Sequence, residues 1–325
     1  MREYIVHKHG GFGVLKYEKI EDEPHPRENE VLIDQAAIGV GFNDVLFRRG
    51  EYKIAKFPAM LGNEACGIVA EVGSKVTEYK EGDRVAYATG PIGAYTQKRI
   101  IHKDFLITPP SSFSDVEVAG CLSKGLMAHT LLHRVYSAAR SKRILVHAAA
   151  GGVGQFVCSW AKHLGLEVFG TVGSDNKISA ATKAGCDHVI NYQKNDFVAA
   201  ISDLTKNKGV GVVYDSVGKD TIIKSLNCLW PMGMCVSYGE SSGKLPLIDL
   251  NHLLFNSLYI TKPTLHLYKS NKIELVLAAN EVFARIKKGI IKPEITSFKF
   301  SQLRMAHKFL ESRESTGSVV IDLKK

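Results

Sequence analysis

The segment His147–Gly154, with the sequence HAAAGGVG, constrains the fold more than any other part of the chain. It follows the apolar run Ile144–Val146, and apolar residues recur at helical spacing from Gly152 to Leu164. A strand, a glycine turn and a helix in this order are typical of a phosphate site. The glycines let the backbone approach a pyrophosphate, and the helix N-terminus offers free N–H groups. The first glycine of the usual GxGxxG fingerprint is Ala149 here, so a tight turn between buried elements stays an alternative.

The residues after the second apolar run, Val168–Val172, indicate which nucleotide is bound. A ribose-binding acid is expected at the end of that strand, but the chain continues with Gly173, Ser174, Asp175, Asn176 and Lys177. A small hydroxyl residue and a lysine suit a 2′-phosphate better than a bare ribose, which favours NADPH. Asp175 opposes this interpretation unless it caps the following helix, and Lys177 as an ordinary surface lysine is the alternative.

Strands and helices alternate from Ser123 onwards, which predicts an α/β fold with a Rossmann-type doubly wound parallel sheet over residues 123–264. Strands are expected at 144–148, 168–172, 188–190, 210–215 and 234–238, and helices at 125–135, 175–184, 195–205 and 220–230, with Asn195 as an N-cap. Residues 1–122 read as a β-rich domain, to which residues 265–325 are expected to return. This return contains a helix over 272–287, the segment 290–298, a helix over 301–312 and a strand over 319–323.

Composition excludes several classes of protein. The 325 residues carry 42 Lys and Arg against 33 Asp and Glu, a formal charge of +9, but the basic residues are spread along the chain without aromatic interleaving. This distribution argues against a nucleic-acid partner. No apolar run is long enough to span a membrane and no signal peptide is evident, so a cytoplasmic location is expected. The six isolated cysteines favour reduced thiols over a disulfide framework.

Five further segments narrow the interpretation: His7–Gly11, Leu61–Val69, Gly170–Gly173, Val189–Tyr192 and Val213–Gly218. With the glycine turn, they resemble the NADPH:quinone oxidoreductases, the zinc-independent family of the medium-chain dehydrogenase/reductase superfamily that includes zeta-crystallin. The resemblance covers nearly the whole chain. It implies a chaperonin-10-like catalytic domain, a Rossmann domain, a cleft between them, NADPH as cofactor and a homodimer formed through the Rossmann domains.

The resemblance also implies roles for individual residues. It places cofactor contacts at Asn43, Gly151, Gly152, Val153, Gly173, Ser174, Lys177, Tyr192, Val217, Tyr238, Gly239, Ser241, Pro263, Thr264, Leu265 and Arg313. Ser174, Lys177 and Tyr192 correspond to the 2′-phosphate and ribose pocket. Gly41, Asn43 and Tyr52 correspond to the substrate side of the cleft, and Tyr52 is the candidate catalytic hydroxyl. A packed aromatic in a turn is the alternative reading of Tyr52.

Departures from the family pattern concern the substrate pocket more than the cofactor. Gly41 stands where the family often has asparagine, Leu46 where it often has an aromatic residue, and Met127 where it has threonine. The family's zinc relatives use a histidine in Gly-His-Glu, which is Asn63 here, and the structural cysteine cluster is missing, so no metal is expected. His129 and His133 have metal-like spacing without an evident third ligand, and His147 is interpreted as structural.

These features predict an enzyme that reduces quinones with NADPH by hydride transfer without a metal. A conjugated, electron-poor acceptor needs positioning more than a Lewis acid. Reduction of alkenals and enones starts with the same hydride attack and is not separated from quinone reduction by the sequence. A non-catalytic, RNA-binding or crystallin-like role is the alternative from another class.

Overall fold

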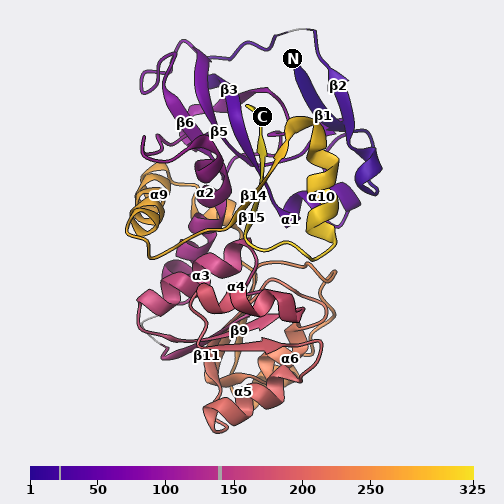
Figure 1. The fold of residues 1–325 in the computed structure, drawn as a ribbon, viewed down its shortest axis with the longest axis vertical. Coiled ribbons are helices and arrows are strands. Elements are labelled where there is room, and N and C mark those ends of the chain that lie inside the picture. Colours follow the sequence, from indigo (N-terminus) through magenta and orange to yellow (C-terminus); the bar gives the residue numbers. More distant parts are fainter. Residues whose placement is uncertain (22, 138–140) are drawn as a thin grey trace. The chain divides into compact units, whose positions relative to one another are not determined.

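The computed structural model describes residues 1–21, 23–137 and 141–325. The chain forms two compact units (Figure 1). Each unit has its own apolar core. The first unit comprises Met1–Ser123, Lys269–Phe283 and Glu294–Lys325, and the second comprises Lys124–Tyr268 and Ala284–Pro293. The assignment of separate functions to residues 1–122, 123–264 and 265–325 stays a prediction.

The first unit is built on two sheets. The smaller sheet is antiparallel, with the order β2-β1-β4. The larger has the order β14-β15-β3-β5-β6, with β7 also pairing with β3. The chain's C-terminal strand β15 pairs antiparallel with β3, Val319 lying opposite Val40. The strands are β1 (Arg2–Val6), β2 (Lys16–Lys19), β3 (Glu30–Val40), β4 (Ala59–Met60), β5 (Glu64–Val72), β6 (Arg84–Tyr87), β7 (Lys98–His102), β14 (Ile295–Lys299) and β15 (Ser318–Asp322).

Helix α10 (Leu303–Glu311) packs against strands β14 and β15 of the larger sheet. In β3 most side chains are buried, and together with β5, β15 and α10 they form one apolar core. The helical segments are η1 (Phe12–Val14), α1 (Phe42–Arg49), η2 (Lys103–Phe105), α2 (Asp115–His129), α9 (Lys272–Lys287), η6 (Phe300–Gln302) and α10 (Leu303–Glu311). The unit boundaries at Ser123 and Phe283 fall inside α2 and α9.

The second unit contains a six-stranded parallel sheet with the order β10-β9-β8-β11-β12-β13. This confirms the predicted fold class. Within this unit α3 and α4 lie on one side of the sheet and α5 and α6 on the other (Figure 1). Every residue of β11 is buried, as expected for a central parallel strand covered on both faces.

The bounds in this unit follow the alternation of the sequence. The strands are β8 (Arg143–Val146), β9 (Glu167–Val172), β10 (His188–Asn191), β11 (Val210–Asp215), β12 (Leu229–Ser237) and β13 (Tyr259–Thr261). The helical segments are η3 (Thr130–Val135), α3 (Gly152–His163), η5 (Asp175–Lys177), α4 (Ile178–Lys183), α5 (Phe197–Thr205), α6 (Ile222–Leu226), α7 (Asn251–Leu254) and α8 (Leu265–Tyr268).

Four expected elements differ in the structure. The helix expected at 125–135 is the end of the longer α2 followed by a π-helical turn over Thr130–Val135. The helix expected at 220–230 ends at Leu226, and residues 229–237 form β12, where a register shift and a positive φ at Met232 interrupt the regular pairing. Asp196, rather than Asn195, caps α5, because its carboxylate accepts the Val198 N–H. The segment 290–298 becomes a strand only from Ile295 onwards.

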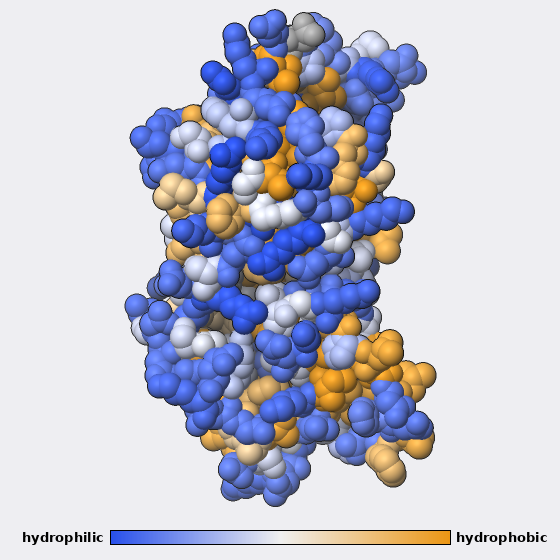
Figure 2. All heavy atoms as spheres, turned by 90° about the vertical axis from the view of Figure 1, so that its right-hand side faces the viewer, coloured by the Kyte–Doolittle hydropathy of each residue, from blue (hydrophilic) through white to orange (hydrophobic). Residues whose placement is uncertain are grey.

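Hydrophobic side chains also gather on the surface of the second unit (Figure 2). Large apolar residues that are more than half exposed there are Met232, Leu247, Leu250, Leu254, Phe255, Tyr259 and Leu267. Most of them belong to α7, to the edge strand β13 or to the segments beside them. Of the helices described, none is long and apolar enough to cross a membrane.

Candidate functional site

The carboxyl ends of all six parallel strands share one edge of the second unit's sheet. Sequence order reverses between β8 and β11, and ligands of open α/β sheets bind outside the strand ends at such a point. The predicted cofactor residues of this unit directly follow these ends. They are Gly151–Val153 after β8, Gly173, Ser174 and Lys177 after β9, Tyr192 after β10, Val217 after β11, Tyr238, Gly239 and Ser241 after β12, and Pro263–Leu265 after β13.

The turn between β8 and α3 is tight enough to require small residues. Ala148 adopts the left-handed conformation with φ 51°, and its carbonyl accepts the Gly151 N–H at 2.9 Å. A Cβ on Gly154 would lie 2.3 Å from the same carbonyl oxygen, so a larger residue would open the turn. The N-cap residue of α3 is Gly151, which has no side chain that could cap the helix. The first N–H groups of α3 are therefore available to bind an anion.

Ala149 stands in place of the first glycine of the fingerprint, and the turn accommodates its methyl group. It is completely buried and its N–H donates to the Thr171 carbonyl at 3.0 Å. The neighbouring strand makes room for its methyl group at Gly170, where a Cβ would lie 2.8 Å from the Ala149 Cβ. A glycine on β9 thus compensates for the missing glycine in the turn.

The end of β9 carries the predicted 2′-phosphate residues. Lys177 ends the short helix η5, and Ser174 precedes it. A Cβ on Gly173 would lie 3.2 Å from the Tyr192 hydroxyl, so this tyrosine stands beside the strand end. The three predicted residues therefore come from two adjacent strand ends.

Asp175 does not cap the helix that follows. Its carboxylate accepts a hydrogen bond from Asn191 at 2.6 Å and pairs with Lys194. Hydrogen bonds from Lys194 and Asn191 lower the pKa of Asp175. The Asp175 carboxylate, which argued against a 2′-phosphate in the sequence, is therefore bound to the side chains of Lys194 and Asn191.

A buried polar network, missed at the sequence level, fixes the loop after β11. Asp215 Oδ1 accepts the N–H groups of Val217 and Gly218 at 2.8 and 2.9 Å, and its carboxylate also accepts the hydroxyls of Thr221 and Ser225. The signal in the sequence is an acid at the end of the apolar strand 210–215, because a buried carboxylate needs hydrogen-bond partners. The network sets the backbone of the predicted Val217 contact.

His147 belongs to the same network and is structural. It is completely buried, with Nδ1 2.8 Å from the Thr171 hydroxyl and Nε2 2.9 Å from the Ser225 hydroxyl. Burial lowers the pKa of His147, against the opposing influence of the Asp215 charge. A neutral imidazole that joins β8, β9 and α6 is consistent with the structural reading of this histidine.

The loops after β11 and β12 are held against each other. The Val217 carbonyl accepts the N–H and the hydroxyl of Ser242 at 2.8 and 2.7 Å. The Ser241 N–H donates to the Ser216 carbonyl at 3.2 Å, and a Cβ on Gly239 would lie 2.9 Å from that carbonyl oxygen. This glycine is required by the close approach of the two loops.

In the first unit, the predicted substrate residues Gly41 and Asn43 lie at the start of α1. Asp44 Oδ2 accepts the Gly41 N–H and the Tyr95 hydroxyl, each at 2.9 Å. Tyr95 Oη also lies 2.9 Å from Nε2 of the buried His307 on α10. Because the phenol donates to Asp44, His307 must donate its Nε2–H to the phenol. This chain of three side chains fixes the loop at residues 41–44 and has no clear signal in the sequence.

Tyr52 and Arg313 also belong to the first unit. The Tyr52 ring packs edge-on against Phe47 with centroids 5.5 Å apart, as the packed-aromatic alternative predicts. Arg313 is exposed and follows α10 in the left-handed conformation, with φ 58°. Roles for these residues, and for Gly41 and Asn43, in catalysis or cofactor binding stay predictions.

The side chains of Glu64 and Cys66, next to Asn63, contact other groups of the first unit. Glu64 is buried and its Oε2 accepts the Ser123 N–H at 3.1 Å. The Cys66 thiol lies against Asp115, and burial raises the pKa of this thiol to about 12. The ring centroids of His129 and His133 lie 5.1 Å apart with the rings tilted by 50°, but residues 1–21, 23–137 and 141–325 contain no group of three or more His, Cys, Asp or Glu that could hold a metal.

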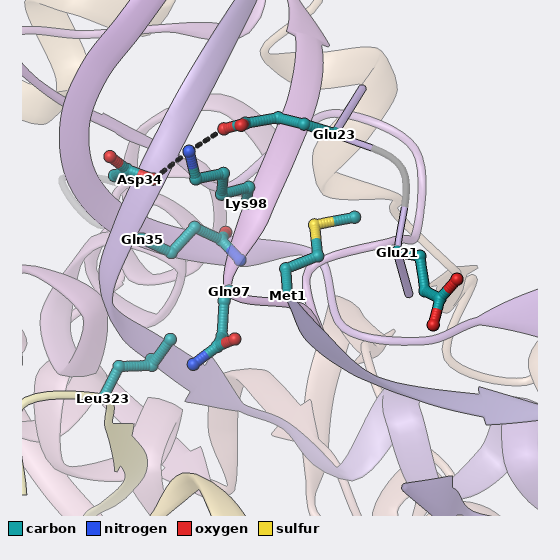
Figure 3. A pocket seen from close by; sticks show the side chains of 8 residues that line it. All are labelled: Met1, Glu21, Glu23, Asp34, Gln35, Gln97, Lys98 and Leu323. Atoms are coloured by element: carbon teal, nitrogen blue, oxygen red, sulfur yellow. Dashed lines mark hydrogen bonds and ion pairs between the residues drawn. The ribbon is translucent and has the colours of Figure 1, made fainter. Parts of the chain in front are cut away.

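A cavity of about 430 Å³ lies elsewhere in the first unit (Figure 3). It is lined by Met1, Glu21, Glu23, Asp34, Gln35, Gln97, Lys98 and Leu323. Lys98 pairs with Glu23 and Asp34, and the Gln35 amide donates to the Ala94 carbonyl at 2.8 Å. None of the predicted site residues lines this cavity.

Comparison with known proteins agrees with this geometry. A family described as alcohol dehydrogenase GroES-like domain matches residues 27–135, and one described as zinc-binding dehydrogenase matches residues 152–279. Quinone oxidoreductase 1 of Escherichia coli (strain K12) is 42% identical over 97% of this chain and 97% of its own length. The 2-haloacrylate reductase of a Burkholderia species is 38% identical over 98% of this chain and 97% of its own length.

Solved structures give the same result. The crystal structure of Escherichia coli quinone oxidoreductase complexed with NADPH has a TM-score of 0.95 and 40% identity, covering 99% of this chain and 100% of that one. The family resemblance and the fold class are therefore confirmed. The chain belongs to the quinone oxidoreductase family of the medium-chain dehydrogenase/reductase superfamily.

Proposed function

We propose that this protein binds NADPH at the carboxyl edge of its parallel sheet and reduces quinones by hydride transfer without a metal ion. The observation that carries the proposal is the gathering of all predicted cofactor residues of the second unit at that edge, around an α3 N-terminus without a side-chain cap. Full-length relatives with quinone oxidoreductase activity in their names support it.

The residues at this edge fit the groups of NADPH. The backbone N–H groups of Gly152 and Val153 would hold the pyrophosphate, for which the tight turn at Ala148 and Gly154 leaves the close approach open. Lys177, Ser174 and Tyr192 would hold the 2′-phosphate through one charge-assisted bond and two hydroxyls. The Asp215 network keeps the Val217 loop rigid where the nicotinamide half would lie.

NADPH, when bound, supplies the hydride that reduces the acceptor. The protein's part is to orient the acceptor and to supply a proton to the developing hydroquinone oxygen. A quinone needs little acid assistance, so water or the Tyr52 hydroxyl would be sufficient. Gly41 lacks the asparagine side chain that the family often has at this position. The substrate pocket would therefore be larger, which suits bulkier quinones, and would have one hydrogen-bond donor fewer.

The test is an assay of NADPH absorbance with benzoquinones, naphthoquinones, enones and primary alcohols as substrates. We expect saturable NADPH oxidation with quinones and no alcohol oxidation by NADP⁺. Alcohol oxidation at rates that match quinone reduction would refute the proposal. Salt-sensitive RNA binding without any NADPH oxidation would instead support the non-catalytic alternative.

Reduction of α,β-unsaturated carbonyls is the second candidate, favoured by one observation. The 2-haloacrylate reductase is 38% identical to this chain, nearly as similar as the quinone oxidoreductases. Activity confined to the enones of the substrate panel would assign this reaction instead.

The protein is further proposed to form a homodimer through the second unit. Strand β13 is the edge of the sheet, and Phe255, Leu250 and Tyr259 near it are 93%, 73% and 56% exposed. Exposed apolar residues beside an open sheet edge are typical of a protein interface. A second copy would cover both the apolar side chains and the edge.

Light scattering after size-exclusion chromatography tests the dimer. Phe255→Asp should convert a dimer into a monomer, whereas Ile273→Asp, at a 70% exposed position on α9 in the first unit, should not. A monomeric wild-type protein would refute the proposal.

We also propose that the protein is located in the cytoplasm. The six free cysteines support this location, because thiols stay reduced in such a compartment.

A further inference from the structure

Two cysteines of the second unit lie in contact although they are far apart in the sequence. The sulfur atoms of Cys158 on α3 and Cys186 before β10 are 3.5 Å apart, although the two residues are 28 positions apart in the sequence. Cys158 is 0% exposed and Cys186 is 5% exposed. Cys66 and Cys228, in contrast, make their thiol contacts with oxygen atoms of Asp115 and Lys224.

The surrounding structure holds these two thiols together from several sides. The Ser159 hydroxyl donates to the Ala184 carbonyl at 2.9 Å, and Lys162 pairs with Asp187 at 2.5 Å. A Cβ on Gly170 would lie 2.5 Å from the Cys186 sulfur, so the glycine on β9 makes room for this side chain. The contacts of Ser159 and Lys162 tie the part of α3 that follows Cys158 to the turn at residues 184–187.

We propose that Cys158 and Cys186 are an oxidation site at which a two-electron oxidant of the peroxide class forms an intramolecular disulfide. The Cys186 sulfur, the more accessible of the two, attacks hydrogen peroxide, breaks the O–O bond and becomes a sulfenic acid while one water leaves. The Cys158 sulfur then attacks the Cys186 sulfur, the S–O bond breaks and a second water leaves. The two thiols lose two electrons and two protons in total, and the peroxide is reduced to two waters.

The geometry makes this reaction selective, and the burial makes it slow. A disulfide has an S–S length of about 2.05 Å, so the sulfurs must approach by about 1.5 Å, a shift within reach of the turn at residues 184–187. The hydrogen bond with Cys186 and burial raise the pKa of the Cys158 thiol well above its usual range. Because the thiolate is the reactive form, the disulfide is expected to accumulate over long exposure.

The disulfide would close a loop between the helix of the phosphate turn and β10. Closing this loop restricts the unfolded chain, so the oxidised protein should have a higher Tm than the reduced protein. This consequence does not depend on the proposed enzymatic function, and its failure would leave that function untouched.

The experiment treats the native protein with hydrogen peroxide and follows it by intact mass and non-reducing peptide mapping. We expect a peptide that links Cys158 to Cys186, a loss of two hydrogen atoms from the protein, and reversal by dithiothreitol with a return of the lower Tm. Circular dichroism before and after treatment checks that the fold is kept.

Variants distinguish this site from general thiol oxidation. Cys186→Ser and Cys158→Ala should each abolish the linked peptide and the rise in Tm, whereas the control Cys228→Ser should keep both. Two different substitutions keep the test valid if one of them fails to fold. The proposal is wrong if the wild-type protein gives no linked peptide, or if another cysteine pair is linked in equal yield.

Discussion

The two units contain buried polar networks that look alike but differ in completeness. In the second unit, Asp215 accepts two backbone N–H groups and two hydroxyls, and both nitrogens of His147 lie within hydrogen-bond distance of hydroxyls. In the first unit, Asp44, Tyr95 and His307 form the network, and His307 Nδ1 is buried without a hydrogen-bond partner among the described residues. Both networks fix a loop that carries predicted site residues.

The difference indicates that the two loops face different demands. A complete network makes a rigid support, which suits a cofactor whose shape is constant. A network with an unsatisfied buried polar atom lowers the free energy of unfolding. This loss of stability occurs beside the loop at residues 41–44, where the substrate residues are predicted. The second unit should therefore lose stability when its network is cut, and the first should respond to acid.

The largest effect is expected when the carboxylate of the second unit is removed. Asp215→Ala leaves the Val217 and Gly218 N–H groups and two hydroxyls without their acceptor, which should lower the free energy of unfolding by about 3–5 kcal/mol. Urea unfolding measures it. The control Asp220→Ala changes an exposed acid in the same loop and should stay within about 0.5 kcal/mol of wild type. Similar losses in both variants would contradict the account.

Acid should act mainly through the first unit. Burial and the Arg48 charge lower the pKa of His307 from 6.5 to about 3, so between these pH values the unfolded state binds more protons than the folded state. Stability should then fall as pH falls below 6.5, at up to about 1.4 kcal/mol per pH unit. His307→Gln should have a shallower decrease between pH 6.5 and pH 4 in urea titrations. Parallel curves for the two proteins would show that another group is responsible.

A smaller effect is expected when the middle of the same network is cut. Tyr95→Phe separates Asp44 from His307 and should cost about 1–3 kcal/mol of stability. Because the loop at residues 41–44 loosens, and Gly41 and Asn43 are predicted to face the substrate, kcat/KM for quinones should fall. Tyr79→Phe, which removes a hydroxyl bound to the Leu106 carbonyl in the same unit, should leave quinone kinetics unchanged. Equal losses of kcat/KM in Tyr95→Phe and Tyr79→Phe would show that the effect of Tyr95→Phe comes from general destabilisation.

The smallest effect is expected at the candidate catalytic hydroxyl. Tyr52 packs against Phe47, so Tyr52→Phe keeps the ring contact and should reduce kcat by less than about tenfold. Steady-state kinetics across several pH values measures it. A loss of about 10²-fold with an altered pH profile would instead identify Tyr52 as the proton donor.

The sequence predicted the parallel sheet well because strand and helix periods differ strongly and each strand is followed by its own turn residues. It did less well at Leu229 and Trp230, which lie in β12 together with Pro231, although the pattern favoured a helix over 220–230. The irregular register of β12 with β11 and the positive φ at Met232 allow a proline there, and neither is visible in local periodicity. Tertiary pairing decided the outcome.

Some residues of the candidate site could be predicted from the sequence and others could not. Residues at strand ends, such as Gly151 and Lys177, could be placed from the sequence because the fold brings all carboxyl ends to one edge. Asp44, Tyr95 and His307 meet from positions up to 263 residues apart, which no local pattern reveals. The same holds for Cys158 and Cys186, which read as isolated buried cysteines in the sequence.

The most direct test of the account is the nucleotide specificity of Lys177→Ala, measured by titration calorimetry with NADPH and NADH. A lysine bound to a 2′-phosphate contributes about 1.5–3 kcal/mol, so the Kd for NADPH should rise about ten- to a hundredfold while the Kd for NADH stays nearly constant. The control Lys183→Ala, an exposed position on α4, should change neither value. Equal weakening of both nucleotides, or no change in either, would contradict the assignment of this sheet edge as the NADPH site.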